Sequence, residues 1–197
     1  MYDYRNLTEE EKRQLVEERR ARGFPSHAPP HYVTQDREIL FTAACYEHIA
    51  HMHSAERRQL LLDRCFEEAQ AAGITIHAWV ILPNHYHLLA QPASNDLRSF
   101  FAHIHGATSF MWNNEDHKRG RKVWYRYADR AIRSERHYYT TLNYIHFNPV
   151  KHGYAASPYE WIESSVHWYR EHFGREWLRG LWVQYPLREY GRTWDID

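Results

Sequence analysis

The sequence predicts an α+β fold with one antiparallel sheet, and three observations lead to this class. Apolar runs of strand length alternate along the chain with patterns of helical period. The two middle runs are separated only by Pro83-Asn84, a turn signal that predicts a hairpin. The two outer connections are long enough for helical crossovers. This order, β-α-β-β-α-β followed by a helix, is the ferredoxin-like (split βαβ) pattern, with helices on one face of the sheet.

Four strands are expected from the apolar and β-branched runs. The first, over residues 37–46, shows no polar alternation, so we expect it to be buried on both faces. The second covers residues 74–82, and the third begins at His85 and ends near residue 91. The fourth is expected over residues 123–132, where aromatic and β-branched residues return.

The crossover helices are marked by their capping residues. Ser54 caps a helix that ends at Gly73, and Ser94 or Asn95 caps a second helix whose apolar face runs over residues 97–111.

A third helix follows the fourth strand and completes the core. Ser134 caps it, and it is expected to run from Glu135 to about Phe147, because Pro149 cannot continue a helix. A residue before proline is pushed out of the α region, so Asn148 is expected at the helix cap. If this helix lies across the free face of the sheet, its side chains can reach the third strand.

Both ends of the chain differ from this core in composition. Residues 1–30 contain a charged helix that begins at Thr8, and a proline-rich linker. The central domain is expected over residues 31–153, and residues 154–197 form an aromatic-rich helical extension. Residues 184–197 are expected to be irregular.

Composition sets limits on function. The chain has 197 residues, 15 of them Tyr and 16 His, with zero formal net charge and a pI near 7.3, which argues against a purely electrostatic nucleic-acid binder. Cys45 and Cys65 form no disulfide framework, so a reducing cytoplasm fits. The charged N-terminus predicts no signal peptide, and no apolar run has the length of a membrane span.

Two His-x-His pairs have the same spacing but different expected surroundings. His85 and His87 begin a strand, where residues two apart share a face, so they could supply two ligands of a metal site or simply two histidines of a half-buried sheet. His103 and His105 fall on a helix, where residues two apart point about 200° from each other. We expect these to be structural or exposed. A third cluster, containing the histidines at 48, 51 and 53, reads as a solvated loop rather than a metal site.

A basic stretch lies between the second and third helices. Residues 118–136 hold eight Lys or Arg against Asp129 and Glu135, an excess of six positive charges. Aromatic side chains alternate with these cations, which suits single-stranded nucleic acid, although cations also protect a sheet edge. The aromatic residues are Trp124, Tyr125 and Tyr127. The candidate DNA-binding residues are Lys118, Arg119, Arg121, Lys122, Arg126, Arg130 and Arg133.

Tyr144 is the candidate nucleophile of the third core helix. Two histidines and one amide oxygen leave open positions on a divalent ion such as Mg²⁺ or Mn²⁺, where a scissile phosphate can bind. A tyrosine can attack that phosphorus and keep one DNA end as an ester. Tyr144 and Asn148 are four residues apart on one helix face, which favours Tyr144 over Tyr138 and Tyr139.

Two motifs now resemble a known family. Pro83-Asn84-His85-Tyr86-His87-Leu88-Leu89 resembles the PNHxHLL signature of the single-tyrosine HUH transposases. Residues 143–153, NYIHFNPVKHG, resemble the YIHxNPVKxG signature of REP-associated tyrosine transposases. Residues 124–134 and 161–165 also fit that branch, and the match covers about residues 31–168. Both signatures in this order are specific, whereas either alone would be weak.

The resemblance implies a metal-dependent enzyme of the bacterial cytoplasm that nicks and rejoins single-stranded DNA at palindromic hairpins. It implies His85, His87 and Asn148 as metal ligands, and Tyr144 as the nucleophile that gives a 5′-phosphotyrosine and a free 3′-OH. The catalytic domain would be residues 31–153. Tyr86 stands where the family usually has a bulky hydrophobic residue, and we expect it to pack away from the metal. No membrane partner is implied, and monomer or dimer is left open.

Three rival functions remain open on the sequence. The first is an HUH endonuclease of the replication or relaxase type, although such proteins often carry partner domains. The second is a non-catalytic hairpin-binding protein derived from a transposase. The third is an unrelated metal hydrolase of small molecules, which would need further acidic or histidine ligands; Asp129 is the only nearby acid to nominate.

Overall fold

The computed structural model describes Thr8, Glu10, Gln14, residues 37–92, residues 97–192 and Trp194. The chain divides into two compact units, residues 1–33 and 34–197, and the second unit is the one described below. The rest of the predicted N-terminal helix, the proline-rich linker and the predicted caps Ser94 and Asn95 lie outside the described residues.

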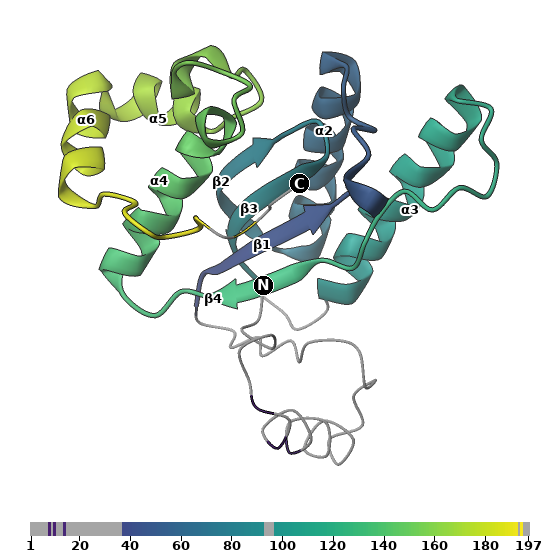
Figure 1. Cartoon of the computed structure of the whole chain (residues 1–197), viewed down its shortest axis with the longest axis horizontal. Helices are drawn as coiled ribbons and strands as arrows, with labels where there is room; N and C mark the ends of the chain where they lie inside the picture. The colour runs from purple at the N-terminus through teal and green to yellow at the C-terminus, as the bar shows by residue number, and fades with distance from the viewer. Residues whose placement is uncertain are drawn as a thin grey trace. The chain divides into compact units, whose positions relative to one another are not determined.

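One antiparallel sheet organises the second unit. Its strands within the described residues are β1 Ile39–Ala44, β2 Thr75–Ile81, β3 His85–Gln91 and β4 Ala128–Ala131. Their order is β2-β3-β1-β4, and every neighbouring pair is antiparallel (Figure 1). This topology confirms the predicted α+β, ferredoxin-like fold.

Helices cover the sheet on both faces. The crossover helices are α2 Ala55–Ala72 and α3 Leu97–Glu115, and the third core helix is α4 Glu135–Lys151. The C-terminal extension adds α5 Val166–Phe173 and α6 Arg175–Gln184, with short 3-10 turns η2 Tyr46–His48 and η3 Pro158–Glu160. Whether the extension is functionally separate from residues 31–153 stays a prediction.

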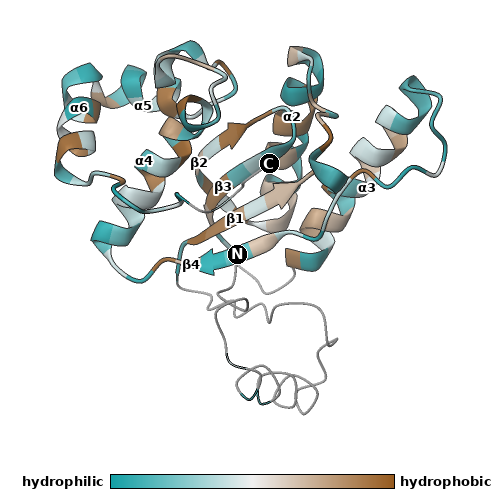
Figure 2. Cartoon of the chain, in the orientation of Figure 1, coloured by the Kyte–Doolittle hydropathy of each residue, from teal (hydrophilic) through white to brown (hydrophobic). Residues whose placement is uncertain are grey.

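Strand alternation assigns each face its helices. Phe41 of β1 contacts Phe101 of α3, with ring centroids 5.3 Å apart. The neighbouring residue Leu40 points the other way and shares a buried cluster with Leu142 and Ile145 of α4. The crossover helices therefore cover one face and α4 the other, as expected for a helix that reaches the third strand. Figure 2 shows the hydrophobic residues along the strands between these helices.

The predicted caps of α2 and α4 are confirmed. The Ser54 hydroxyl accepts a hydrogen bond from the Arg57 N–H at 3.3 Å, and Gly73 ends α2 with a left-handed φ of 67°. The Ser134 hydroxyl accepts one from the His137 N–H at 3.2 Å. These caps fix where α4 begins, and hence which of its side chains face β3.

The fourth strand is shorter than predicted. The residues before Ala128 make only an isolated bridge, between Trp124 and Cys45, and the register shifts by one residue between that bridge and the Thr42–Ala128 pair. One extra residue on the β4 side is a bulge, and it interrupts the ladder where the chain must turn Trp124 into the interior. The run was read as one strand because a bulge leaves no mark in an apolar pattern.

Pro149 does not end α4, contrary to the prediction. The helix continues to Lys151, and Asn148 is a helical residue rather than a cap. Pro149 cannot donate a hydrogen bond from its nitrogen, and its ring crowds the carbonyl of Ile145, yet the buried end of α4 stays helical despite this cost. The carbonyl of Asn148 still accepts a hydrogen bond from the His152 N–H at 3.1 Å. Asn148 is thereby held on the same face as Tyr144.

Two further expectations concern the cysteines and membranes. Cys45 and Cys65 are both buried and unbridged, and burial raises the pKa of the Cys45 thiol to about 12. In the part of the chain that the structure describes, no helix combines the length and the apolar character needed to cross a membrane.

Candidate active site

The two histidines of β3 lie side by side beneath α4. His85 pairs with Ala44 of β1, and His87 pairs with Thr42 of β1 and Val80 of β2. Because they are two residues apart on a strand, both side chains point to the α4 face. Their ring centroids are 5.1 Å apart, and both residues are buried.

Each ring is oriented by a polar neighbour at Nδ1. The Asn84 side-chain oxygen lies 2.8 Å from His85 Nδ1, and the Thr42 hydroxyl lies 2.8 Å from His87 Nδ1. Both oxygens can accept the Nδ1 proton, an arrangement that leaves the Nε2 lone pair for another partner. The two Nε2 atoms therefore point toward α4. The contact of Thr42 with His87 joins two strands and has no sequence signal, whereas Asn84 directly precedes His85 in the predicted turn.

Helix α4 brings an oxygen to each of these nitrogens. Asn148 Oδ1 lies 3.1 Å from His85 Nε2, and the Tyr144 hydroxyl lies 3.5 Å from His87 Nε2. The spacing of four residues places both side chains on one helix face. Both are buried, with Tyr144 only 1% exposed. The structure thus brings together all four residues that the sequence predicts for catalysis and metal binding.

The site has the donors expected of a divalent-ion centre. Two imidazole nitrogens and one amide oxygen suit a first-row divalent ion and leave positions for a phosphate. The side-chain oxygen of Asn148 faces His85 Nε2, and its side-chain nitrogen is buried without a hydrogen-bond partner. Among the described residues, no group of three or more His, Cys, Asp or Glu is placed to hold a metal. Beside the two imidazoles, α4 brings the amide oxygen of Asn148.

Two further side chains, at the C-terminal end of α4 and its cap, border the site. The ring of His152, one turn beyond Asn148, lies 4.8 Å from the ring of His85. The ammonium group of Lys151 lies 5.3 Å from the centre of the Tyr144 ring and donates a hydrogen bond to the Gly191 carbonyl at 2.8 Å. The spacing of four residues from Tyr144 to Asn148 and on to His152 is the feature of the sequence that places His152 near this site.

The C-terminal segment, described over residues 185–192 and Trp194, covers Tyr144. The ring of Tyr144 is 5.8 Å from the ring of Tyr190 and 5.4 Å from that of Trp194. Gly191 has a left-handed φ of 73°, and a Cβ there would overlap the Tyr144 ring, so only glycine fits without a shift. The described residues of this segment have no regular secondary structure, as predicted, yet they pack directly on the candidate nucleophile.

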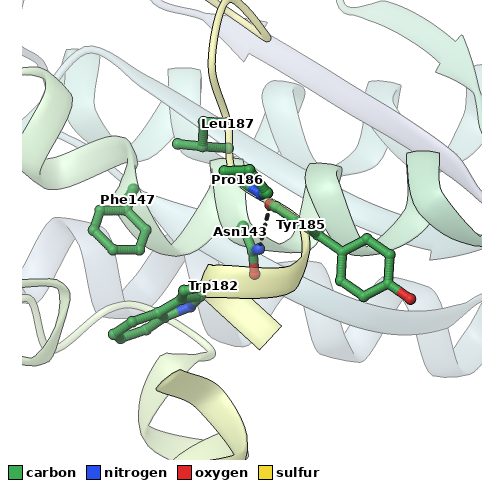
Figure 3. Close-up of a pocket in the computed structure, with 6 residues that line it drawn as sticks. All are labelled: Asn143, Phe147, Trp182, Tyr185, Pro186 and Leu187. Carbon is green, nitrogen blue, oxygen red and sulfur yellow. Dashed lines mark hydrogen bonds between the residues drawn. The ribbon is translucent and has the colours of Figure 1, made fainter. Parts of the chain in front are cut away.

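A separate cavity lies between α4, the end of α6 and the residues that follow α6. It has a volume of about 230 Å³ (Figure 3). Asn143 donates hydrogen bonds from its side chain to the carbonyls of Leu181 and Tyr185, at 3.2 and 2.8 Å, and so fastens α6 to α4. The lining residues are Asn143, Phe147, Trp182, Tyr185, Pro186 and Leu187, and none of them belongs to the histidine site.

Most of the candidate DNA-binding cations are exposed, but two are engaged within the protein. Arg130 lies 3.9 Å over the ring of Trp194, on the face of the sheet that carries the histidines. Arg121 bonds Asp116 at 2.7 Å and Asn113 at 2.9 Å. The exposed candidates are Lys118, Arg119, Lys122, Arg126 and Arg133.

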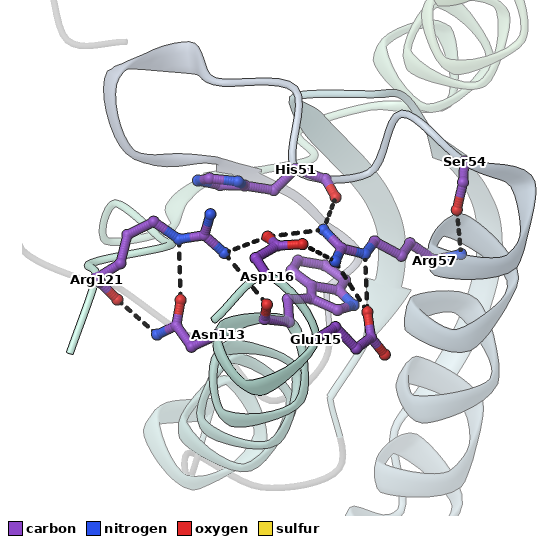
Figure 4. A network of polar contacts seen from close by, with 8 residues as sticks. His51, Ser54, Arg57, Asn113, Glu115, Asp116 and Arg121 are labelled. Carbon is purple, nitrogen blue, oxygen red and sulfur yellow. Dashed lines mark hydrogen bonds and ion pairs between the residues drawn. The ribbon is translucent and has the colours of Figure 1, made fainter. Parts of the chain in front are cut away.

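Arg121 belongs to an ionic network that joins α2 to the end of α3. Arg57 bonds both Glu115 and Asp116, and its guanidinium also donates to the His51 carbonyl at 3.0 Å (Figure 4). Hydrogen bonds from Arg57 first, and then Arg121, lower the pKa of Asp116 to about 2. His51 is buried, so the prediction of a solvated loop was wrong for this histidine.

The aromatic residues of the basic stretch face different ways. Trp124 is buried; its ring stacks on His105 at 4.5 Å, and its N–H donates to the Thr108 hydroxyl at 3.0 Å. Tyr127 stacks on Phe101 at 3.9 Å. Of the three aromatic residues, only Tyr125 is exposed, so Trp124 and Tyr127 pack within the protein and do not present their rings to DNA bases.

Comparisons with known proteins support the resemblance. No family model matches the chain. The REP-associated tyrosine transposase of Escherichia coli K12 is 29% identical over 132 residues, which span 62% of this chain and 66% of the relative. A Haemophilus influenzae protein, provisionally named for the same family, is 34% identical over 98 residues, 44% of this chain and 56% of the relative. The match therefore spans less than two thirds of each relative.

A solved structure has the same fold. It is described as a REP-associated tyrosine transposase bound to a REP hairpin, and it superimposes with a TM-score of 0.61 over 74% of this chain and 86% of the other. Its sequence identity of 22% limits this likeness to the fold. With the two relatives, it confirms the resemblance that the two signatures carry.

Proposed function

We propose that this chain, a relative of the REP-associated tyrosine transposases, nicks and rejoins single-stranded DNA at palindromic hairpins through a 5′-phosphotyrosine. The observation that carries the proposal is the meeting of β3 and α4. There, the hydroxyl of Tyr144 lies 3.5 Å from His87 Nε2, and Asn148 Oδ1 lies 3.1 Å from His85 Nε2. A nucleophile beside a nitrogen and oxygen donor set is what phosphodiester cleavage of this kind requires.

His85, His87 and Asn148 would hold a divalent ion, Mg²⁺ or Mn²⁺. Such an ion would polarise a phosphoryl oxygen and neutralise charge in the transition state. Asn84 and Thr42 contact the Nδ1 atoms of the two imidazoles, which leaves both Nε2 atoms directed toward Asn148 and Tyr144 of α4.

Tyr144 would carry out the covalent step. Its oxygen forms a bond to phosphorus while the bond from phosphorus to the 3′ oxygen breaks; the phenol loses its proton, and the 3′ oxygen gains one. The products are a DNA 5′ end joined to Tyr144 and a free 3′-OH. Attack of a 3′-OH on the phosphotyrosine reverses the reaction, so rejoining needs no ATP.

A hairpin substrate is inferred from the relatives and from charge. The solved structure with the same fold is described with a REP hairpin. Here, exposed cations of residues 118–133 can contact DNA phosphates, and Arg121 would act indirectly by holding the end of α3.

The covered state of Tyr144 favours a second candidate, a protein that binds hairpins without cutting them. Tyr144 is 1% exposed beneath Gly191 and its neighbours. A phosphate can reach the hydroxyl only if this segment shifts, and a protein in which it never shifts would bind DNA and leave it intact.

Covalent capture of DNA separates the two candidates. Single-stranded oligonucleotides from palindromes that flank the gene are incubated with the protein and Mn²⁺ or Mg²⁺, and the products are run on a denaturing gel. We expect a protein band shifted by DNA that disappears with EDTA and in Tyr144→Phe. Tyr139→Phe is the matched control, because it lies on the same helix and stacks on Tyr185 instead.

The gel also defines failure. Attachment that survives in Tyr144→Phe would move the nucleophile to another tyrosine. Retarded complexes on a native gel, with no covalent band in either metal over a wide set of hairpins, would favour the second candidate.

A further inference from the structure

We infer that Tyr125, backed by Tyr46 and Lys122, forms a platform on which one unpaired base of the DNA stacks beside the candidate active site. This inference rests on the proposed function and adds a residue that positions the single-stranded part of the substrate. The three residues are called the tyrosine platform below.

Backbone hydrogen bonds join Tyr125 to the end of β1, and Tyr46 to the stretch of chain that carries Tyr125. The Tyr125 N–H donates to the Ala44 carbonyl at 2.9 Å, and the Tyr46 N–H donates to the Val123 carbonyl at 2.7 Å. Ala44 is also the register partner of His85. The platform therefore lies at the end of the sheet where the two histidines begin β3.

The loop that carries Tyr46 is fastened to the turn before His85. The Cys45 N–H donates to the Asn84 carbonyl at 2.7 Å, and the Met52 N–H donates to the Pro83 carbonyl at 2.9 Å. A base held on this loop is thus held in a fixed relation to the histidines, as a positioning site requires.

The rings of the platform support one another. Tyr46 and Tyr125 have centroids 4.9 Å apart, with their planes inclined by 50°. The ammonium group of Lys122 lies 4.2 Å from the Tyr46 ring and 5.5 Å from the Tyr125 ring, within the range of a cation–π contact. With Tyr46 packed beside it, Tyr125 remains 38% exposed, enough to offer ring surface to a base.

The backbone next to the platform adopts an unfavourable conformation. Glu47 and His48 have φ values of 55° and 54°, the left-handed region that non-glycine residues rarely occupy. Such conformations persist where the surrounding structure enforces them, and they cluster at functional sites. Here the turn brings the His48 ring to 6.0 Å from Tyr125.

The charge around the platform identifies nucleic acid as the occupant. Lys118, Arg119, Lys122 and Arg126 are exposed on the same stretch of chain. The acids at the end of α3 are engaged by Arg57 and Arg121, so they do not cancel this charge fully. Single-stranded DNA needs both cations for its phosphates and a flat partner for its bases, and this surface offers both.

The test is a mutant cycle between a residue and a base. Fluorescence anisotropy measures the affinity of hairpin oligonucleotides with unpaired flanks, in which each flank position in turn is replaced by an abasic site. All proteins carry Tyr144→Phe, so that binding is measured without cleavage. Three such proteins are compared: one with Tyr125 unchanged, one with Tyr125→Ala and one with Tyr125→Phe.

We expect one abasic position to weaken binding by roughly tenfold when Tyr125 is present, the effect of one lost stacking contact. The same abasic position should have little effect in Tyr125→Ala. Tyr125→Phe keeps the ring and should behave like the unchanged residue. Phe173→Ala removes an aromatic side chain that is 50% exposed on α5, and it should leave every affinity unchanged.

Equal losses on intact and abasic DNA, or no loss at all in Tyr125→Ala, would overturn the platform while covalent attachment to Tyr144 could still stand. Coupling between Tyr125 and one base, without covalent attachment in the Tyr144 protein, would support the platform and reject cleavage. An absence of binding to any oligonucleotide at low salt would overturn the platform and the hairpin substrate together.

Discussion

The two His-x-His pairs have the same spacing, but their side chains differ in direction and in exposure. On β3, His85 and His87 lie side by side with ring centroids 5.1 Å apart, and both are buried. On α3, His103 has a side chain that is 67% exposed and bonds Glu68, whereas His105 is half-buried. The spacing of two carries meaning only together with the period of the element, since a strand returns to the same face every two residues and a helix does not.

Their partners differ as much as their directions. Each histidine of β3 has an oxygen near both ring nitrogens, the surroundings of a ligand held in one orientation. His105 instead stacks on Trp124 and meets the Tyr86 hydroxyl at 2.8 Å. Tyr86, the middle residue of the β3 pair, thus points to the opposite face and packs against His105, away from the two histidines of β3 as predicted.

The largest contrast between the two pairs is expected in cleavage. His87→Ala should lower the rate of covalent DNA attachment by more than about 100-fold, beyond the effect typical of changes to second-sphere residues. His103→Ala should leave the rate unchanged, because its ring is exposed and far from α4. The measurement is the covalent band on a denaturing gel over time, at saturating Mn²⁺.

Hairpin affinity and thermal unfolding of each variant show that it is folded. Undiminished attachment in His87→Ala would remove the metal site from the proposal. Equal losses in both variants would mean that the two pairs do not differ in function.

The sequence was sufficient for the parts of this comparison that depend on local pattern. Strand period placed His85 and His87 on one face, and the spacing of four placed Tyr144 with Asn148. The hairpin and the two crossovers gave the sheet order. The caps Ser54 and Ser134 were read directly from residue type.

The sequence was insufficient where distant segments meet. The contact of Thr42 with His87, the ion pair of Arg57 with Asp116 and the packing of Gly191 on Tyr144 join residues whose pairing no local pattern encodes. The predictions of a longer fourth strand and of a helix that ends before Pro149 were wrong for a related reason, since tertiary packing overrode local preference.

A smaller effect is expected at the residue that orients His87. Thr42→Val keeps the shape of the side chain but removes the hydroxyl 2.8 Å from Nδ1. Affinity for Mn²⁺, measured by calorimetry, should fall by about 10- to 100-fold, with hairpin affinity unchanged. Thr42→Ser retains the hydroxyl and should restore most of the affinity. A loss of equal size in Thr42→Ser would mean that packing in β1, rather than the hydrogen bond, matters at this position.

The smallest effect concerns His105, the half-buried member of the helical pair, and is seen in how the free energy of unfolding depends on pH. Burial lowers the pKa of His105 from 6.5 to about 3, so the folded protein keeps this ring neutral while the unfolded chain takes up a proton. Its contribution is complete above about pH 6.5 and is lost as the pH falls toward 3. At pH 5.5 the loss should be about 1.4 kcal/mol relative to neutral pH.

Urea unfolding at pH 7.5 and 5.5 isolates this contribution. Other buried histidines, including His51 and His146, also have lowered pKa values, so the informative quantity is the difference in pH dependence between the natural chain and His105→Gln. The variant loses the stacking contact with Trp124 at both pH values but gains no proton, so its pH dependence should be smaller by about 1.4 kcal/mol. If His105→Gln has the same pH dependence as the natural chain, the ring of His105 is protonated in the folded protein without cost.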